Sequence, residues 1–382
     1  MSRHLLSYRS VLCVAVAVTA GFWTAGFARP GGVALTAPTI TSTGKFGYVS
    51  GESTNFVGTP GRFTLSDPGS TITGFDYFFD DGAPTYIAAG PRGLATVAVT
   101  PNSPELLELS VAAVDGQDSS PGPVTTFDIE PGLPVGNVAA LAWWRLNGGK
   151  GTAETDGTGY GKTAKLTGDA MSDCANAVAP NGYRCSLSVG GQGGQALAAP
   201  SLLPVLSLDG SATVSAWVNV SKCSNSCVAL SEDGAPGYSF ALGYQRICHA
   251  AGKAGACWKL TMSEEGSTPP VVITVASAPG SAKLSSWTQL TAEFYAEHGQ
   301  LLLYVNGAQQ GQGIPYSPSN GATGYVRIGD VMPGGTTNDW DGRISDVCLF
   351  YGPMPASDVS LLYRGNAAHP HDGCAALVAK YP

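Results

Sequence analysis

Charged residues are scarce in this 382-residue chain, where Asp, Glu, Lys and Arg together make up 13% of the sequence. That is about half the share found in ordinary globular proteins. The formal net charge is −8, and Lys and Arg are scattered along the chain. We therefore expect no nucleic-acid partner, because phosphate binding needs a basic face. Since 43% of the residues are apolar, the chain can build folded cores.

Long apolar runs are also missing, except near the N-terminus. The stretch from Val11 to Ala28 carries no charge and follows Arg3 and Arg9. A basic start, a short apolar run and small residues beyond it are typical of a cleaved signal peptide. An uncleaved anchor is the alternative, because the stretch just reaches the minimum length of a membrane span. We expect residues 1–37 to be a signal peptide and short leader, and the protein to be secreted, with no membrane association unless the leader stays uncleaved.

Catalytic motifs are lacking as well. No Gly-x-Ser-x-Gly elbow occurs, and the few histidines are isolated. The segment 157–163 resembles a phosphate loop but lacks its spacing. Glu293 and Glu297 would lie about 13 Å apart on a strand, which is too far for a glycosidase carboxylate pair. We therefore expect a protein that is not an enzyme.

The cysteines are confined to one part of the chain. Eight of the nine fall between Cys174 and Cys374, and the ninth, Cys13, lies in the leader. An even set of cysteines in an exported chain indicates disulfides. Proximity in sequence suggests four pairs: Cys174–Cys185, Cys223–Cys227, Cys248–Cys257 and Cys348–Cys374. Eight cysteines allow 105 pairings, and a four-thiolate zinc site is the alternative for the middle four.

The pattern of apolar residues predicts an all-β protein with two domains. Residues 38–131 contain short alternating runs that end at turn signals such as Asp115-Gly116. This part resembles the immunoglobulin-like or fibronectin type III-like modules of bacterial surface proteins. Residues 132–137 form a Pro/Gly hinge, which is the expected boundary.

Residues 138–366 carry a second strand pattern. Thr213–Val220 alternates, with Val214 and Val218 on one face, and 300–307 ends on Asn-Gly, a strong hairpin signal. A short helix is expected after Pro355. These segments resemble, in order, the laminin G-like (concanavalin A-like) jelly roll of secreted bacterial proteins. The motifs that carry the resemblance are Ala142-Trp-Trp-Arg-Leu, Asp156-Gly-Thr-Gly, Ala212-Thr-Val-Ser-Ala-Trp-Val, Leu302-Leu-Tyr-Val-Asn-Gly and Trp340-Asp-Gly-Arg-Ile-Ser-Asp-Val. We expect residues 367–382 to form a tail tethered by Cys348–Cys374.

The resemblance implies two antiparallel sheets, with binding by loops or by a concave face. It also implies a structural calcium ion, for which Asp156 and Asp346 are the candidate ligands. Alternatively, Asp156 is a turn residue and Asp346 a capping acceptor. The candidate ligand-binding residues near loops are Trp340, Asp339, Asp341, Tyr244 and Trp258.

We therefore expect a secreted, non-catalytic module that binds an extracellular glycan or surface polymer. One alternative is a structural or adhesion protein that contacts other proteins. Another is a glycoside hydrolase with an unrecognised site.

Overall fold

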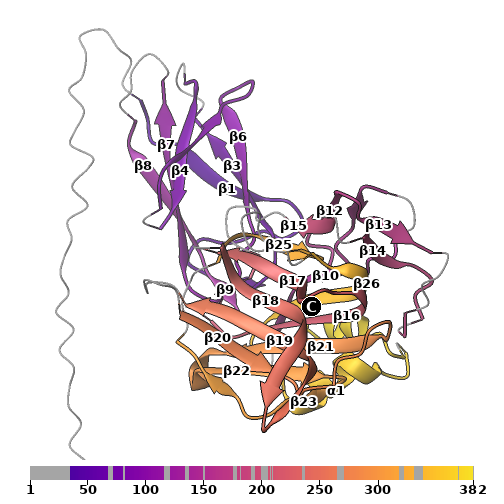
Figure 1. The fold of residues 1–382 in the computed structure, drawn as a ribbon. Helices are drawn as coiled ribbons and strands as arrows, with labels where there is room; N and C mark the ends of the chain where they lie inside the picture. Colours follow the sequence, from indigo (N-terminus) through magenta and orange to yellow (C-terminus); the bar gives the residue numbers. More distant parts are fainter. Residues whose placement is uncertain are drawn as a thin grey trace, which may run out of the picture.

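The computed structural model describes residues 35–381, apart from 68–71, 81, 116–120, 134–136, 149–150, 175–178, 181, 191–193, 199–204, 207, 209, 235–236, 265–270, 318–321, 331–338 and 369. An N-terminal β-sandwich is followed by a larger two-sheet domain with two short helices (Figure 1). The predicted leader, with Cys13, lies outside the described residues. Among the described residues, no helix is both long and apolar enough to cross a membrane.

Two small antiparallel sheets form the N-terminal sandwich. The first has the order β1–β3–β6: β1 (Thr39–Thr43), β3 (Gly61–Ser66) and β6 (Leu94–Val99). The second has the order β5–β4–β7–β8: β5 (Thr85–Ala88), β4 (Gly74–Phe79), β7 (Leu107–Val114) and β8 (Val124–Ile129). Their inner faces enclose a core that includes Phe63, Leu65, Phe75 and Leu109. The immunoglobulin-like class of this sandwich stays a prediction.

The larger domain contains a nine-stranded sheet. Its main path runs β13–β14–β26–β16–β21–β22–β23, with β10 beside β26 and β24 beside β22. The strands are β10 (Ala139–Trp144), β13 (Met171–Asp173), β14 (Ser186–Gly190), β16 (Ala212–Lys222), β21 (Thr288–Tyr295), β22 (Gln300–Val305), β23 (Ala308–Gln309), β24 (Ile314–Pro315) and β26 (Asp341–Tyr351).

An eight-stranded antiparallel sheet packs against it, in the order β11–β12–β15–β25–β17–β18–β19–β20. The strands are β11 (Ala153–Glu154), β12 (Ala164–Thr167), β15 (Gln195–Ala198), β17 (Ser226–Gly234), β18 (Gly237–Ala250), β19 (Lys253–Glu264), β20 (Val271–Ala276) and β25 (Ala322–Ile328). The main core lies between the two sheets and includes the predicted inward residues Val214, Ala216, Val218 and Val220. The predicted all-β fold with antiparallel sheets is confirmed.

Two helices cover the outer face of the nine-stranded sheet. They are α1 (Ala356–Arg364), the predicted helix, and α2 (Gly373–Lys380), which was expected to be tail; a short 3-10 turn, η1 (Ala296–His298), follows β21. Val359 and Leu362 of α1 and Leu377 of α2 pack in a second apolar cluster with Phe350 and Trp143 of the sheet.

The N-terminal sandwich contacts the jelly roll beyond the predicted hinge. The short strands β2 (Asn55–Phe56) and β9 (Pro131–Gly132) pair in parallel, and the Val57 side chain belongs to the main core of the larger domain. The Phe46 and Tyr160 rings meet edge to face, with centroids 6.5 Å apart. A Cβ added to Gly58 (φ +88°) would lie 2.6 Å from the Ala140 carbonyl oxygen. Glycine is therefore needed where the two domains meet.

Candidate functional site

The outer face of the eight-stranded sheet differs from that of the nine-stranded sheet in what packs on it, and the side chains at its centre, such as Asp233, Ala241 and Arg327, are buried. On the nine-stranded sheet, α1 and α2 pack over the corresponding face. No described helix packs on the outer face of the eight-stranded sheet.

A buried ion pair lies on this outer face. Val326 and Ile328 point into the core, so Arg327 between them points outward. Arg327 Nε donates to Asp233 Oδ1 at 2.6 Å, and its Nη2 donates to Asp233 Oδ2 at 2.9 Å. The Arg327 Nη1 donates to Gln195 Oε1 at 2.9 Å. Three adjacent strands, β15, β25 and β17, thus contribute one side chain each to a single planar network.

The network is buried and held rigidly. Arg327 and Asp233 are only 7% and 5% exposed. A bidentate pair of planar groups in this environment has little freedom to rotate. A guanidinium has five N–H groups, and three of them donate within the network. The other two N–H groups of Arg327 have no acceptor among the described residues.

An aromatic ring flanks the ion pair. Tyr325 is two residues before Arg327 on β25, so both point outward, and the Tyr325 ring is 38% exposed. The Arg327 guanidinium carbon lies 5.8 Å from the ring centroid. Across β17 and β18, Val228 and Ala241 form a small apolar patch against Tyr238, and burial raises the pKa of the Tyr238 phenol. The face therefore combines aromatic, apolar and hydrogen-bonding groups, as small-molecule sites do.

The three predicted aromatic ligand residues lie elsewhere. Trp340, Tyr244 and Trp258 are buried in the main core, with Trp340 and Trp258 fully enclosed. Tyr244 and Trp258 are cross-strand partners whose rings meet edge to face at 5.8 Å. The prediction that these rings stack on a ligand is wrong for this packing, because none of them presents a face to solvent.

Asp339 and Asp341 are both half-buried around Trp340. Asp341 begins β26 and lies between Gly190 of β14 and Lys222 of β16. The structure thus places Asp341 on the nine-stranded sheet, whereas Arg327 belongs to the eight-stranded sheet. A role of these two carboxylates in ligand binding stays a prediction.

Asp156 organises the loop that follows β11. Its Oδ1 accepts from the backbone N–H of Trp143 at 3.1 Å and of Thr158 at 3.0 Å. Its Oδ2 accepts from Thr158 Oγ1 at 2.7 Å and from the backbone N–H of Lys162 at 3.2 Å. Four donors around one carboxylate are the arrangement of a turn-stabilising aspartate.

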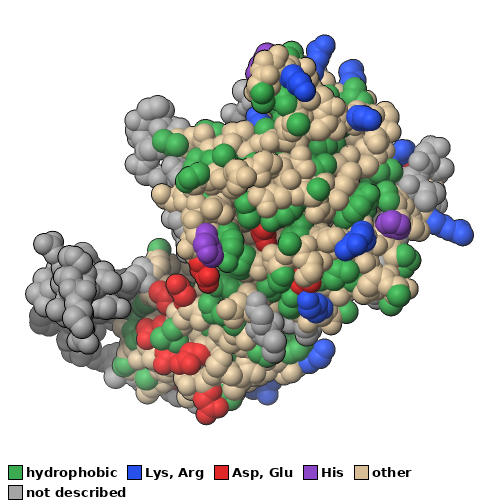
Figure 2. Space-filling view, turned by 90° about the horizontal axis from the view of Figure 1, so that it is seen from below, with side chains coloured by type: hydrophobic (Ala, Val, Ile, Leu, Met, Phe, Trp, Pro, Cys, Tyr) green, Lys and Arg blue, Asp and Glu red, His purple; other side chains and the backbone are tan. Residues whose placement is uncertain are grey.

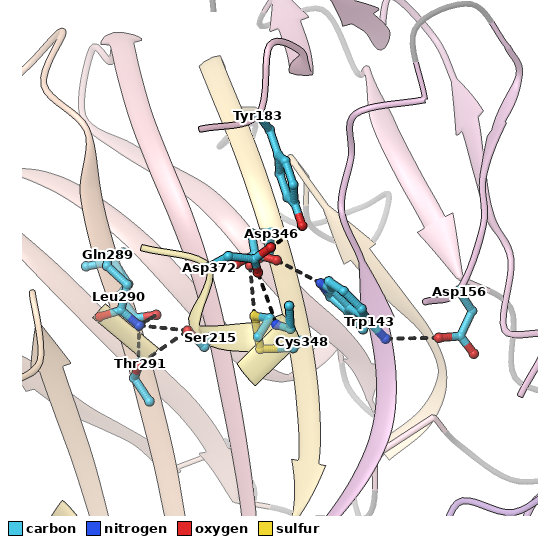
Figure 3. The surroundings of a disulfide bond; sticks show 12 residues. Trp143, Asp156, Tyr183, Ser215, Gln289, Leu290, Thr291, Asp346, Cys348 and Asp372 are labelled. Carbon is cyan, nitrogen blue, oxygen red and sulfur yellow. Dashed lines mark hydrogen bonds between the residues drawn. A yellow bond between two sulfur atoms is a disulfide. The ribbon is translucent and has the colours of Figure 1, made fainter. Parts of the chain in front are cut away.

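Asp346 belongs to a different cluster, formed by a buried pair of carboxyl groups (Figure 3). It occupies a left-handed position of β26 (φ 53°), is 1% exposed, and its Oδ1 accepts from Trp143 Nε1 at 2.7 Å. The Asp346 carboxyl group lies against that of Asp372, whose own two oxygens accept from the Ala375 backbone N–H and from the Tyr183 hydroxyl.

A shared proton accounts for this geometry. Asp346 Oδ2 is buried and has no hydrogen-bond partner among the described residues, and the Asp346 and Asp372 carboxyl groups interact directly. Burial, and then the neighbouring Asp372 charge, raise the pKa of Asp346 well above its usual range. One proton between the two groups satisfies the orphaned oxygen and removes the like-charge repulsion.

The structure brings the two candidate calcium ligands to different ends of Trp143, and a calcium ion held by them stays a prediction. Both bind Trp143, but Asp156 takes its backbone N–H and Asp346 its indole N–H (Figure 3). Calcium requires six to eight oxygen ligands. Every oxygen of Asp156 already accepts hydrogen bonds, and no cluster of three or more His, Cys, Asp or Glu suited to a metal occurs in the described part of the chain.

The calcium prediction is tested by thermal melting. Because the Asp156 oxygens are occupied by N–H and O–H donors, we expect the same melting temperature in calcium and in excess chelator. Differential scanning calorimetry of the secreted protein measures this. A rise of several degrees in calcium, lost in an Asp156→Asn variant, would identify Asp156 as a calcium ligand.

The four disulfides join the cysteines that proximity suggested, Cys174–Cys185, Cys223–Cys227, Cys248–Cys257 and Cys348–Cys374. The first three close short loops. Cys348 and Cys374 tie β26 to α2, next to the Asp346–Asp372 pair (Figure 3). The four disulfide bonds indicate that the protein is located in an oxidising compartment. The middle four cysteines are in disulfides and not in a zinc site.

Comparison with known proteins confirms the fold family of the larger domain. Residues 190–360 match a laminin G-like family model described as the concanavalin A-like lectin/glucanases superfamily. The jelly roll of this chain is therefore a concanavalin A-like domain. No curated protein matches the chain at a significant level.

Solved structures with a similar arrangement come from several organisms. Domain 4 of AbnA, a GH43 extracellular arabinanase from Geobacillus stearothermophilus, in complex with arabinotriose, is 15% identical, with a TM-score of 0.42, over 59% of this chain and 98% of that one. The CBM40 of Ruminococcus gnavus IT-sialidase bound to alpha2,3 sialyllactose is 15% identical, with a TM-score of 0.32, over 41% and 83%. A Trypanosoma rangeli sialidase is 12% identical, with a TM-score of 0.46, and this chain covers 53% of its length.

Proposed function

We propose that this chain is a secreted, non-catalytic glycan-binding protein, with its ligand on the outer face of the eight-stranded sheet around Tyr325 and Arg327. The observation that carries the proposal is the planar Gln195–Arg327–Asp233 network beside the half-exposed Tyr325 ring. Sugars present hydroxyl groups that both donate and accept hydrogen bonds, and an apolar ring face that packs on an aromatic side chain. The site offers partners for both.

The surface charge supports an uncharged or weakly charged ligand rather than a nucleic acid. Figure 2 shows Asp and Glu gathered on one part of the face drawn there, while Lys and Arg are spread over other parts. Broad phosphate recognition needs the opposite distribution. Four disulfides, together with the expected leader, support a location outside the cell.

Replacing Tyr325 by Ala is expected to weaken glycan binding at least about tenfold, which corresponds to about 1.4 kcal/mol. The ring is partly exposed, so its loss removes a ligand contact without opening the core. A glycan array with the secreted wild-type protein identifies the ligand, and titration calorimetry compares the variant. Tyr86→Ala in the N-terminal sandwich, where the ring is 53% exposed, is the matched control.

The outcomes separate the alternatives. Unchanged glycan binding by Tyr325→Ala would move the site off this face. Absence of binding to any glycan would favour a structural or adhesion protein that contacts other proteins. Release of sugar from a bound glycan would favour a glycoside hydrolase, and an Asp346→Asn variant would then show whether the buried carboxyl pair takes part.

A further inference from the structure

One end of the jelly roll is built from three segments that contain basic residues and no acidic ones. They are residues 219–231 around the turn between β16 and β17, residues 237–263 of the β18–β19 hairpin, and residues 271–292 from β20 into β21. The chain as a whole has the opposite balance, with 28 acidic and 20 basic residues. The basic residues of the three segments are Lys222, Arg246, Lys253, Lys259 and Lys283.

The β16–β17 turn and the hairpin are held together at this end. The disulfide Cys223–Cys227 closes the turn. The Arg246 backbone N–H donates to the Asn225 carbonyl at 2.7 Å, and the Arg246 Nη1 donates to the Ser224 carbonyl at 3.2 Å. The exposed Arg246 side chain is therefore fixed beside the turn.

Residues 282–285 join the hairpin to β16. The Ala282 N–H donates to the Ala256 carbonyl of β19 at 3.3 Å, and the Ser285 N–H donates to the Val220 carbonyl of β16 at 2.7 Å. All three segments thus meet in one surface. We call this surface the basic end, and it consists of residues 222–226, 246–256 and 282–285.

Three cations are exposed at the basic end. They are Arg246, Lys253 and Lys283, and none of them takes part in the ion pairs found in the described part of the chain. Lys222 differs from them, because it lies opposite Asp341 of β26 and its charge is partly balanced. We therefore assign the positive charge of this surface to the other three.

Two aliphatic side chains are exposed next to these cations. Ile247 follows Arg246 and is 55% exposed, and Leu284 follows Lys283 and is 47% exposed. Single exposed apolar residues are ordinary on a protein surface. Here each of the two adjoins a cation on loops that hydrogen bonds and disulfides hold in place. Cations beside aliphatic side chains are the composition of a surface that binds in the interface of a membrane.

We propose that the basic end binds the surface of a membrane that contains anionic lipids. Anionic headgroups attract each Lys or Arg near the surface, and the aliphatic side chains enter the boundary between headgroups and acyl chains. An acidic polysaccharide would pair with the cations, but it offers no apolar layer for Ile247 and Leu284. A lipid surface accommodates both kinds of side chain, so the observations favour it. The contact is peripheral and needs no membrane-spanning segment.

The electrostatic part is tested with the secreted protein and sedimented vesicles at about 0.1 M salt. We expect binding to vesicles of equal parts phosphatidylglycerol and phosphatidylcholine, and much weaker binding to phosphatidylcholine alone. Each Lys or Arg near an anionic surface contributes about fivefold, so Lys253→Gln/Lys283→Gln should weaken partitioning about 25-fold. Lys45→Gln/Lys165→Gln removes the same charge at exposed lysines elsewhere and is the matched control.

The apolar part is tested by Ile247→Ser/Leu284→Ser. Removing two aliphatic side chains that enter the lipid should weaken partitioning at least about tenfold without changing the charge. Both positions are exposed, so the fold is retained, which an unchanged melting temperature verifies. Leu106→Ser/Val124→Ser, at exposed residues of the N-terminal sandwich, is the matched control and should bind like the wild type.

The outcomes decide between the possible occupants of the basic end. No binding of the wild type to the mixed vesicles would overturn the proposal, as would binding that either double variant of the basic end retains in full. Retention on immobilised polygalacturonate without binding to vesicles would assign the surface to an acidic polysaccharide instead. These vesicles carry no sugar, so the result leaves the glycan proposal at Tyr325 to its own test.

Discussion

Replacing Arg327 by Met is expected to destabilise the protein by about 3–5 kcal/mol, the range measured when one partner of a buried ion pair is removed. Asp233 is 5% exposed in the wild type, and the variant removes the two guanidinium N–H donors from which its carboxylate accepts. Gln195 loses its partner at the same time. The cost is therefore that of an uncompensated buried charge, which far exceeds the value of a surface pair. Urea unfolding followed by tryptophan fluorescence measures it.

A double variant provides the control for this result. Arg327→Met/Asp233→Asn removes the orphaned charge, so it should recover much of the lost stability. Arg343→Met breaks the more exposed pair with Asp173 and should cost less than the Arg327 variant. An Arg327→Met effect below about 1 kcal/mol would mean that the pair is solvated like a surface one, and that the face is not the rigid site described.

The stability of the protein is expected to fall as the pH rises above the ordinary carboxyl pKa near 4. Burial raises the pKa of four carboxyl groups: Glu154, Glu232, Glu293 and Asp346. At a pH between the ordinary pKa near 4 and the raised pKa of the folded state, each group holds its proton in the folded state and has lost it in the unfolded state. The folded state then binds more protons, so stability is greatest below the unfolded pKa and declines through the folded one.

The proton held by Asp346 should contribute a measurable part of the decline in stability with pH. An Asp346→Asn amide stays neutral at every pH, and it can accept from Trp143 Nε1 and donate to Asp372 where the shared proton lies. We expect this variant to have a flatter pH profile and to be more stable than the wild type at neutral pH. Denaturant unfolding at several pH values compares it with Glu297→Gln, at an exposed glutamate. A wild-type stability that increases towards pH 8, or an Asp346→Asn profile as steep as that of the wild type, would contradict the shared proton.

Local patterns in the sequence were sufficient to predict much of the fold. Val214, Ala216, Val218 and Val220 alternate and lie on the core face of β16, as period-two patterning predicts. The four disulfides are all between neighbours in sequence, with separations of 4 to 26 residues, so proximity alone found them. Helix α2 was missed because its eight residues are mostly buried and lack an amphipathic period.

The site residues depend on register between strands, which local patterns do not supply. Tyr244 and Trp258 were placed near turns, but β18 and β19 continue beyond them as strands of 14 and 12 residues. Their direction follows from alternation with outward neighbours such as Lys259. The segment Gly324-Tyr-Val-Arg-Ile328 did hold a signal for the outer face, since Tyr325 and Arg327 alternate with two core residues. The partner of Arg327, Asp233, lies 94 residues away, and only the pairing of β17 with β25 brings them together.

The most direct test of the proposed glycan site is a crystal structure of the secreted protein with the oligosaccharide that binds best on the glycan array. We expect the sugar on the outer face of the eight-stranded sheet, with a ring on Tyr325 and a hydroxyl or carboxyl oxygen on the two N–H groups of Arg327 that lie outside the network. A sugar bound at the loops around Asp339 and Asp341, or on the N-terminal sandwich, would contradict it.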